Sequence, residues 1–403
     1  MTTSWPETVA QARELRRALH RRPEIAWTEH ATAATVRDIL DTAAIPRRDC
    51  AQTGTVGVLA PHAPGRHVAL RADLDGLPIT EQTGLVYASE HAGLMHACGH
   101  DGHTATLIAA ARWLKAQEDS LPGPVTLLFQ PAEEGGHGAA RMIEDGCLGP
   151  PLGNAGGRPV DVVFGWHNWP ALPLGRALCP DGPVMAANGT FRVELQGRGG
   201  HASQPENTRD PVLAAAAVTV ALQQVVARRL APQEAAVLAV TSLQAESAPT
   251  VTPDTAALGG SIRVPDLGVR DRVFDAITEI ATDTAAAHGV SAEVQTFARY
   301  SATVNHPAPA TELRDALTAV FGDDWPRHQA AAPVMASEDF SYYLQEVPGA
   351  FALIGGGSAD AKETAPLHNA RYDFNDDLID PVARLLVGLA GGARVPTADK
   401  KPR

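Results

Sequence analysis

The sequence lacks several features that mark special classes of protein. No apolar run approaches the ~18 residues that a membrane span needs, which argues against an integral membrane protein. Only four cysteines (Cys50, Cys98, Cys147 and Cys179) are scattered over 403 residues, so there is no disulfide framework of the kind found in small secreted proteins. Lys and Arg number 33 against 46 Asp and Glu, and the resulting net charge of −13 argues against nucleic-acid binding.

The beginning of the sequence also lacks the pattern of a signal peptide. Met-Thr-Thr-Ser-Trp-Pro-Glu-Thr has neither a basic start nor an apolar core. We therefore expect a cytoplasmic protein with reduced cysteines, in which Cys98 is available to a metal. Hydrophobic residues make up 44% and charged residues 20%, which is typical of a soluble globular protein. The length exceeds that of a single hydrophobic core, so we expect about two or three domains.

The first part of the chain has the pattern of an α/β sheet. Helical periodicity at 8–20 and 31–44 is followed by alternating apolar strands and helices. The strands are predicted at 67–73, 125–130 and 160–166, and the helices between them at 104–117 and 138–145. This alternation indicates a sheet flanked by helices.

Near residue 188 the pattern changes to that of a second sheet. Its elements follow a β-α-β-β-α-β order, with strands at 191–195, 236–243, 255–263 and 292–300 and helices at 211–229 and 269–287. The first pattern resumes near 305, with a strand at 351–354 and a helix at 378–390. We therefore predict a discontinuous domain (1–187 and 304–392), an inserted α+β domain (188–303) and a flexible tail (393–403).

One short stretch combines three imidazoles, a thiol and a carboxylate: His96-Ala97-Cys98-Gly99-His100-Asp101-Gly102-His103. Thiolate and neutral imidazole are preferred ligands for zinc and for cobalt, nickel and manganese. The alternative is a polar loop in which histidines cluster by chance, since the chain contains 15 of them. The stretch by itself favours a metal site.

Further candidates follow predicted strands of the larger domain. Asp73, the pair Glu133–Glu134 and His167 each come at or after a strand end. Because open α/β sheets bind ligands at the carboxyl ends of their strands, these residues can converge. One carboxylate of the pair can ligate a metal while the other accepts a proton from the attacking water. The alternatives are a solvated acidic turn and, for His167, a core histidine.

His368 precedes the last predicted helix and is weak evidence alone. Cys98, His100, Glu134, His167 and His368 together provide five ligands, which is enough for two metals that share one bridging group. In the inserted domain, the glycine-rich turn 197–200 presents His201, and glycines permit close backbone approach. A simple hairpin turn is the alternative there. Arg263 either pairs with a substrate carboxylate or is an ordinary surface arginine.

The ordered motifs resemble one known family over nearly the whole chain. They are Arg71–Pro78, His96–His103, Gln130–Gly136, Gly165–Pro170, Gly197–Ser203 and Ala336–Phe340. They are similar to those of the aminoacylase, hippurate hydrolase and auxin-conjugate hydrolase family of dinuclear metallopeptidases, in its amidohydrolase branch. The resemblance implies that the discontinuous domain is catalytic. It also implies that the insert is a lid and dimerisation domain, and hence a homodimer or larger homo-oligomer.

The resemblance also implies roles for individual residues. Cys98 would bridge two divalent metals (Zn, Mn, Co or Ni), and His100, Glu134, His167 and His368 would complete the two sites. Glu133 would be the general base and acid. His96 and His103 would support or pack against the ligands, and Asp101 would orient one of them.

The remaining implied roles concern the substrate. Asp73 would be a site carboxylate beside the ligands or facing the substrate, because Arg71 stands where peptidase relatives have a metal-binding histidine. His201 would hold the oxyanion, either within its own subunit or across a dimer interface. We predict that Arg263 and Asn207 contact the substrate. Glu206 stands where many relatives have histidine, so acyl or side-chain preference would differ.

The predicted function is metal-dependent hydrolysis of an N-acyl amino acid, such as an N-acetyl or N-benzoyl derivative, to a carboxylic acid and a free amino acid. A dipeptidase or carboxypeptidase on the same scaffold is the nearest alternative. A non-catalytic metal- or small-molecule-binding protein is the alternative from another class. A serine hydrolase is disfavoured because the chain has no G-x-S-x-G elbow. The native metal, the acyl group, the amino acid and the oligomer size stay open.

Overall fold

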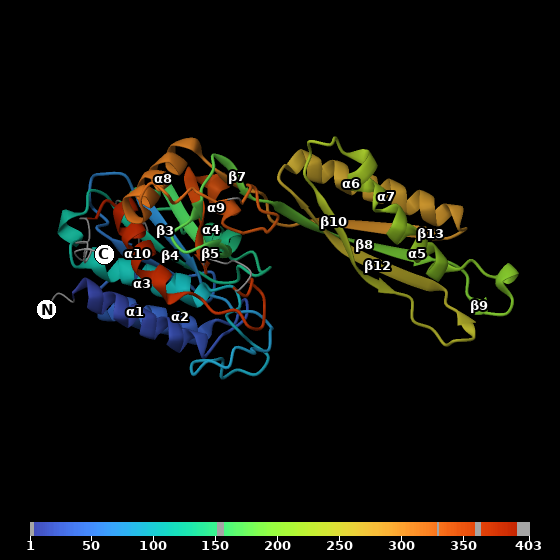
Figure 1. Cartoon of the computed structure of the whole chain (residues 1–403), viewed down its shortest axis with the longest axis horizontal. Coiled ribbons are helices and arrows are strands. Elements are labelled where there is room, and N and C mark those ends of the chain that lie inside the picture. The colour runs from blue at the N-terminus through green and yellow to red at the C-terminus, as the bar shows by residue number, and fades with distance from the viewer. Residues whose placement is uncertain (1–3, 151–156, 329, 359–363, 393–403) are drawn as a thin grey trace. The chain divides into compact units, whose positions relative to one another are not determined.

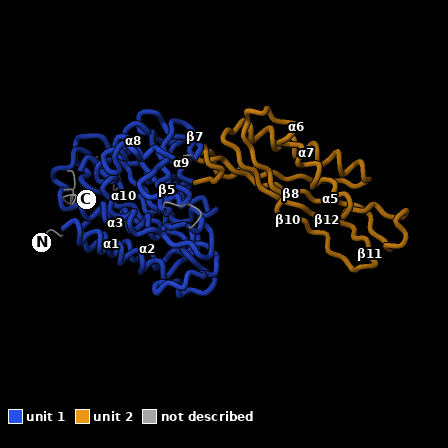
Figure 2. Tube along the Cα trace, viewed as in Figure 1, with its two compact units in different colours: residues 1–184, 304–332, 339–403 blue, residues 185–303, 333–338 orange. Residues whose placement is uncertain are grey.

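The computed structural model describes residues 4–150, 157–328, 330–358 and 364–392, so the predicted tail at 393–403 lies outside the described residues. The chain divides into two compact units, which Figure 2 shows in different colours. The first consists of Met1–Val184, Val304–Ala332 and Asp339–Arg403, and the second of Met185–Thr303 and Pro333–Glu338. The segment 333–338, which the sequence pattern assigned to the discontinuous domain, belongs to the second unit.

A seven-stranded mixed sheet forms the centre of the first unit (Figure 1). Four neighbouring strands, β4, β3, β5 and β15, are parallel; β2 and β6 run antiparallel to their neighbours β4 and β15, and β1 runs antiparallel to β2. In spatial order the strands are β1 (Arg47–Cys50), β2 (Gly54–Leu59), β4 (Val125–Gln130), β3 (Val68–Asp73), β5 (Val162–Pro173), β15 (Gly349–Gly357) and β6 (Ala177–Leu178). Every residue of β2, β3 and β4 is buried, because helices cover both faces of such sheets.

The helices of this unit are α1 (Trp5–His20), α2 (His30–Thr42), α3 (His100–Lys115), α4 (Gly138–Glu144), α8 (Pro307–Phe321), α9 (Ser341–Glu346) and α10 (Ile379–Leu389). The alanine-rich α3 is buried along almost its whole length, because it packs against β3, α1 and α10. It begins at His100, four residues earlier than the sequence pattern predicts. Strands β1 and β2 and helix α8 were not predicted. The predicted α/β class, with a mixed sheet flanked by helices, is confirmed.

The second unit contains the predicted β-α-β-β-α-β order. Its antiparallel strands lie in the spatial order β10 (Val237–Gln244), β12 (Thr255–Val264), β8 (Ala187–Gln196) and β13 (Ser291–Ala298). Alternate side chains of β8 and β12 pack against α7 (Leu267–Ala287) and α5 (Pro211–Ala221). The predicted helix at 211–229 is divided into α5 and α6 (Gln224–Arg229).

Short strands complete the two units: β7 (Gly182–Met185) pairs with β14 (Thr303–Asn305), and β9 (Gly200–His201) pairs with β11 (Val251–Thr252). Among the described residues no helix, including the 21-residue α7, combines the length and apolar character needed to cross a bilayer.

Candidate metal centre

The candidate ligands gather at the carboxyl edge of the four parallel strands. Asp73 ends β3, and it lies beside Gln130 at the end of β4. His167 lies inside β5, which extends to Pro173 and is longer than the sequence pattern predicts. Four imidazoles, a thiol and several carboxylates from distant parts of the chain meet at this edge, as expected for open α/β sheets.

Gly99 brings Cys98 and His100 to this edge. Its φ of 90° lies in the left-handed region, which glycine adopts without strain. A Cβ atom at this position would lie 2.7 Å from Asn168 Oδ1 and 2.9 Å from the Tyr372 hydroxyl oxygen. Both the conformation and the space therefore require glycine between the thiol and the first residue of α3.

Two groups of potential ligands share the Cys98 thiol. Cys98, His100 and His167 form one group, and Cys98, Glu134 and His368 form the other; within each group the ligand atoms lie within 4.8 Å of one another. Cys98 Sγ is 3.3 Å from His167 Nε2, and His368 Nε2 is 3.0 Å from Glu134 Oε1. The structure thus brings together all five residues that the sequence singled out as ligands.

Contacts at Nδ1 hold two of the imidazoles and leave Nε2 for a metal. His167 Nδ1 donates to the backbone oxygen of Asn168 at 2.7 Å, and His100 Nδ1 lies 3.2 Å from Asp75 Oδ1. His100 Nε2 is fully buried and has no hydrogen-bond partner in the described part of the chain, with Asp73 Oδ2 at 3.6 Å. Metal-binding histidines characteristically have their second ring nitrogen held in this way. The unused buried nitrogen fits a divalent metal.

The charges at the site also fit a cation. Burial raises the pKa of the Cys98 thiol well above its usual range, and the Glu134 and Glu133 carboxylates raise it further. Burial alone would lower the pKa of His100, yet Asp73 and Asp75 raise it to about 10. The chain therefore gathers more negative than positive charge here, and a thiolate would need a compensating cation.

The loop after β4 presents two adjacent carboxylates with different surroundings. Ala132, which precedes them, has a left-handed φ of 54°. The backbone N–H of Glu134 donates to Asp75 Oδ2 at 2.8 Å, and the Glu134 side chain lies with Cys98 and His368. The Glu133 side chain is 5% exposed, and its Oε1 accepts from the backbone N–H of Asp339 at 3.3 Å.

Asp73 and His103 are bound to each other rather than directed at a substrate. Asp73 Oδ1 is 2.6 Å from His103 Nδ1, and Oδ2 accepts from Arg71 Nη1 at 2.6 Å. His103 Nε2 is 2.6 Å from Asn168 Oδ1, so both of its nitrogens are used. The sequence left open whether Asp73 lies beside the candidate ligands or faces the substrate, and these contacts favour the position beside the ligands.

Two other expectations for the cluster at 96–103 have different outcomes. Asp101 does not orient a ligand, because its Oδ2 lies 3.0 Å from Arg16 Nε and 2.8 Å from His20 Nδ1 in a separate buried ion network. His96 is buried and neither of its ring nitrogens has a hydrogen-bond partner among the described residues. Burial lowers the pKa of His96 to about 4, so it packs as a neutral ring.

Sequence reasoning missed Asp75, which contacts two candidate ligands, and Asn168, which contacts the neighbouring His103. Asp75 contacts both His100 and the Glu134 backbone, and Asn168 contacts His103. The i, i+2 spacing of Asp73 and Asp75 at a strand end was the available signal for the first. No comparable signal marked Asn168, because its partner lies 65 residues earlier in the chain.

The predicted substrate residues His201, Asn207 and Arg263 lie in the second unit. His201 is exposed on β9; the backbone N–H of Ser203 donates to its Nδ1 at 3.2 Å, so a neutral ring carries its proton on Nε2. Asn207 is exposed at the end of a 3₁₀ turn. Arg263 is half-buried and donates to Ser337 Oγ at 3.1 Å; burial and then Arg299 lower its pKa.

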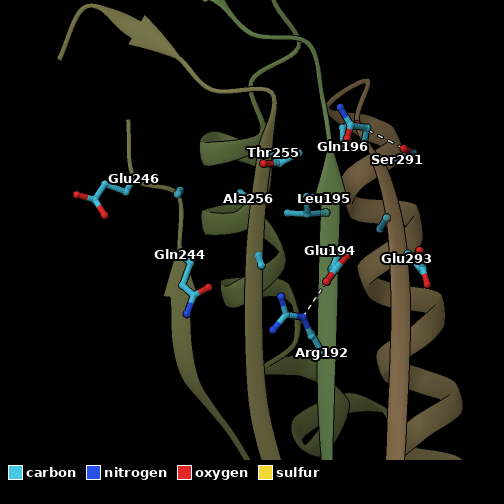
Figure 3. A pocket seen from close by; sticks show the side chains of 13 residues that line it. Arg192, Glu194, Leu195, Gln196, Gln244, Glu246, Thr255, Ala256, Ser291 and Glu293 are labelled. Carbon is cyan, nitrogen blue, oxygen red and sulfur yellow. Dashed lines mark hydrogen bonds and ion pairs between the residues drawn. The ribbon is translucent and has the colours of Figure 1, made fainter. Parts of the chain in front are cut away.

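The second unit also carries an open pocket of about 580 Å³ on the face of its sheet opposite the helices (Figure 3). Arg192, Glu194, Gln196, Gln244 and Glu293 are among its lining side chains, and Arg192 Nε lies 2.9 Å from Glu194 Oε1. The lining contains neither histidine nor cysteine. It therefore lacks the donors of the metal centre, and we assign it no catalytic role.

Comparisons with known proteins identify the family of this chain. The model of peptidase family M20/M25/M40 matches residues 69–391. The N-acetyl-L-cysteine deacetylase of Bacillus subtilis is 40% identical over 85% of this chain and 79% of its own length. An IAA-amino acid hydrolase of Arabidopsis thaliana, ILR1-like 2, is 34% identical over 96% of this chain and 85% of its own length. The hippurate hydrolase of Campylobacter jejuni is 34% identical over 94% of this chain and 95% of its own length.

A solved structure shows the same fold. The YxeP protein of Bacillus subtilis, described as a dinuclear metal binding peptidase from the M20 family, superposes with a TM-score of 0.77 at 29% identity. The superposition covers 96% of this chain and 99% of the YxeP chain. The resemblance drawn from the motifs is confirmed by the family match and by the three named hydrolases. The chain belongs to peptidase family M20/M25/M40.

Proposed function

We propose that this protein is a metal-dependent amidohydrolase that cleaves the amide bond of N-acyl amino acids and releases a carboxylic acid and a free amino acid. The observation that carries this proposal is the buried Glu133 carboxylate beside ligand groups that share one thiol. The relatives named as N-acetyl-L-cysteine deacetylase, IAA-amino acid hydrolase and hippurate hydrolase support the substrate class.

We propose that two divalent ions are held by Cys98, His100, Glu134, His167 and His368, with Cys98 as the shared ligand. The two overlapping ligand groups and the description of YxeP as dinuclear support this assignment. When bound, such ions polarise a carbonyl group and lower the pKa of water. Zinc, manganese, cobalt and nickel all suit this mixed set. The four cysteines are free and buried, which supports the proposed cytoplasmic location.

Glu133 is the proposed proton carrier. Its carboxylate takes the proton from the attacking water and delivers it to the nitrogen of the departing amine. The hydrogen bond from the Asp339 N–H holds Oε1, and burial limits access of bulk water to the carboxylate. Glu134 is instead bound to His368, whose hydrogen bond lowers the Glu134 pKa against the opposing effect of burial. The two neighbouring carboxylates therefore take different roles.

The second unit supplies the proposed substrate contacts. His201 in its Nε2–H form donates to the developing oxyanion. Arg263 pairs with the carboxylate of the amino acid, and its proximity to Arg299 makes an anionic partner favourable. The exposed Asn207 amide contributes a further polar contact.

We also propose that copies of the protein associate through the second unit as a homodimer or larger homo-oligomer. The outward face of α5 exposes Leu213 at 58% and Val220 at 73%, and β10 lies at the edge of the sheet with Val237 and Leu243 exposed. An exposed apolar helix face and an exposed edge strand are both surfaces that a second copy can cover. Light scattering of the wild type and of Val220→Glu tests this, with the variant expected to shift to the monomer.

A substrate panel tests the function. The metal-stripped protein is reloaded with each metal and assayed on N-acetyl, N-benzoyl and indole-3-acetyl amino acids and on dipeptides. N-acyl amino acids should be cleaved best; faster cleavage of dipeptides would favour the peptidase alternative. A metal-loaded protein inert on every amide would favour a binding protein.

Glu133→Gln tests the proton carrier in the same assay. The amide keeps the shape and the acceptor for Asp339 but cannot take a proton, so turnover should fall by at least about 10²–10⁴-fold with metal content unchanged. The exposed Glu144→Gln on α4 is the control. Near-wild-type turnover by Glu133→Gln would reject the role.

A further inference from the structure

A buried carboxylate outside the metal centre binds the loop that carries Glu133. Glu29 is fully buried, and its Oε1 accepts from the backbone N–H of Ala132 at 2.8 Å. Its Oε2 accepts from the Thr53 hydroxyl at 2.7 Å. Thr53 and Ala132 are buried as well. Three segments that are distant in the sequence therefore meet at one side chain that neither ligates nor faces the proposed metals.

The bonded amide belongs to the residue that directs the chain into Glu133. Ala132 adopts a left-handed φ of 54°, which an alanine keeps only when its surroundings enforce it. Glu29 binds its N–H, and the N–H of Gly138 donates to its carbonyl oxygen at 3.1 Å. The two bonds fix the peptide groups on either side of the strained residue, and Glu29 supplies the one that comes from outside the loop.

The same N-terminal segment contacts the far end of the loop. Trp27 also has a left-handed φ, 69°, and a Cβ atom on Gly136 would lie 2.9 Å from the Trp27 indole nitrogen. The segment thus contacts the loop at both 132 and 136. Glu134 has its own anchor, because its N–H donates to Asp75. Glu133 follows Ala132 directly, so the φ of Ala132 sets the direction in which the chain enters Glu133, whose Oε1 then accepts from the Asp339 N–H.

We propose that Glu29 is a positioning residue for Glu133: by accepting from the Ala132 N–H it holds the left-handed turn that directs the Glu133 carboxylate. This inference rests on the proposed function, in which Glu133 carries the proton. Without the acceptor the Ala132 N–H is buried and unbonded, and the turn relaxes toward ordinary φ values. A base displaced by about 1 Å loses on the order of 10²-fold in rate.

Three variants separate positioning from general stabilisation. Glu29→Leu removes both acceptors; Glu29→Gln keeps an acceptor for Ala132 and offers its NH₂ to the Thr53 hydroxyl, which can also accept. Thr53→Val is the matched control, because it removes the other hydrogen bond of Glu29 and leaves the Ala132 bond intact. Glu29→Leu should lower kcat by about 10²-fold with KM changed far less and metal content unchanged. Glu29→Gln should restore kcat toward the wild-type value. Thr53→Val should have a lower melting temperature and a kcat near that of the wild type.

Amide hydrogen exchange gives a readout apart from activity. The Ala132 and Glu133 amides should exchange faster in Glu29→Leu than in Thr53→Val. Equal kcat and equal exchange in these two variants would overturn the proposal. Should Glu29→Leu fail to fold, Glu29→Asp replaces it: the shorter side chain withdraws the acceptor, and a wild-type kcat would refute the role.

Failure of the proposed function would look different. If the wild type cleaves no N-acyl amino acid, or if Glu133→Gln is as active as the wild type, the assigned chemistry fails. The exchange comparison would then still show whether Glu29 orders the loop. If wild type and Glu133→Gln behave as expected but Glu29→Leu keeps full kcat, only the role of Glu29 fails.

Discussion

Replacing Asp75 by asparagine should weaken metal binding without removing a ligand. Asp75 Oδ1 lies 3.2 Å from His100 Nδ1, and Oδ2 accepts from the Glu134 N–H at 2.8 Å. Both partners are N–H donors when His100 ligates through Nε2. Asparagine has only one acceptor, so in either orientation its NH₂ faces a donor. One lost buried hydrogen bond costs about 1–3 kcal/mol, and we expect about 10–100-fold weaker metal binding.

Competition with a chelator of known affinity measures the metal Kd of Asp75→Asn, and elemental analysis gives the stoichiometry. Asp101→Asn is the control, because Asp101 is equally buried on α3 but contacts Arg16 and His20 instead of a ligand. The control variant should have a lower melting temperature than the wild type and the same Kd for the metal. Wild-type affinity in Asp75→Asn, or equal losses of affinity in both variants, would refute the reasoning.

Cys98→Ser should lose metal at both positions, because Cys98 belongs to both ligand groups; two ions retained per chain would contradict the shared thiol. His201→Phe should lower kcat by about 10²–10³-fold in steady-state assays, since it removes the proposed oxyanion donor, and an unchanged kcat would exclude that role. Burial alone would lower the pKa of His20, yet Asp101 raises it from 6.5 to about 9. The His20–Asp101 pair therefore stabilises the fold fully at pH values below the pKa of His20 in the unfolded chain. This stabilisation is lost as the pH rises through about 9, the pKa of His20 in the folded protein. The free energy of unfolding in urea should decline over this pH range for the wild type and not for His20→Gln. Parallel pH profiles of the two proteins would contradict the stabilising role of the pair.

The residues that we propose as metal ligands were predictable because their donor groups lie in short, recognisable stretches of sequence. A thiol and an imidazole two positions apart, and two carboxylates after an apolar strand, identify donors before any fold is known. The parallel sheet then brings them together, since strand ends share one edge. The same reasoning placed Asp101 wrongly, because its partners Arg16 and His20 lie on a helix some 80 residues earlier in the chain.

The elements that were missed have weak local patterns. β1 reads Arg-Arg-Asp-Cys, and its pairing with β2 rather than its own periodicity makes it a strand. The start of α3 was hidden because the first helical turn carries histidines and an aspartate in place of apolar residues. Asp75 acts partly on a backbone N–H, and a backbone group leaves no trace in the sequence.

The interruption of the first unit has a consequence for synthesis on the ribosome. β5 is completed before the second unit, whereas β15, its parallel neighbour, is made only after residues 185–303 have emerged. During that interval one edge of β5 lacks its neighbouring strand. His167 has then been made, but His368, another candidate ligand, has not. Nascent chains arrested before Gly349 should therefore present an open, apolar sheet edge and depend on chaperones, whereas chains arrested after Gly357 should not.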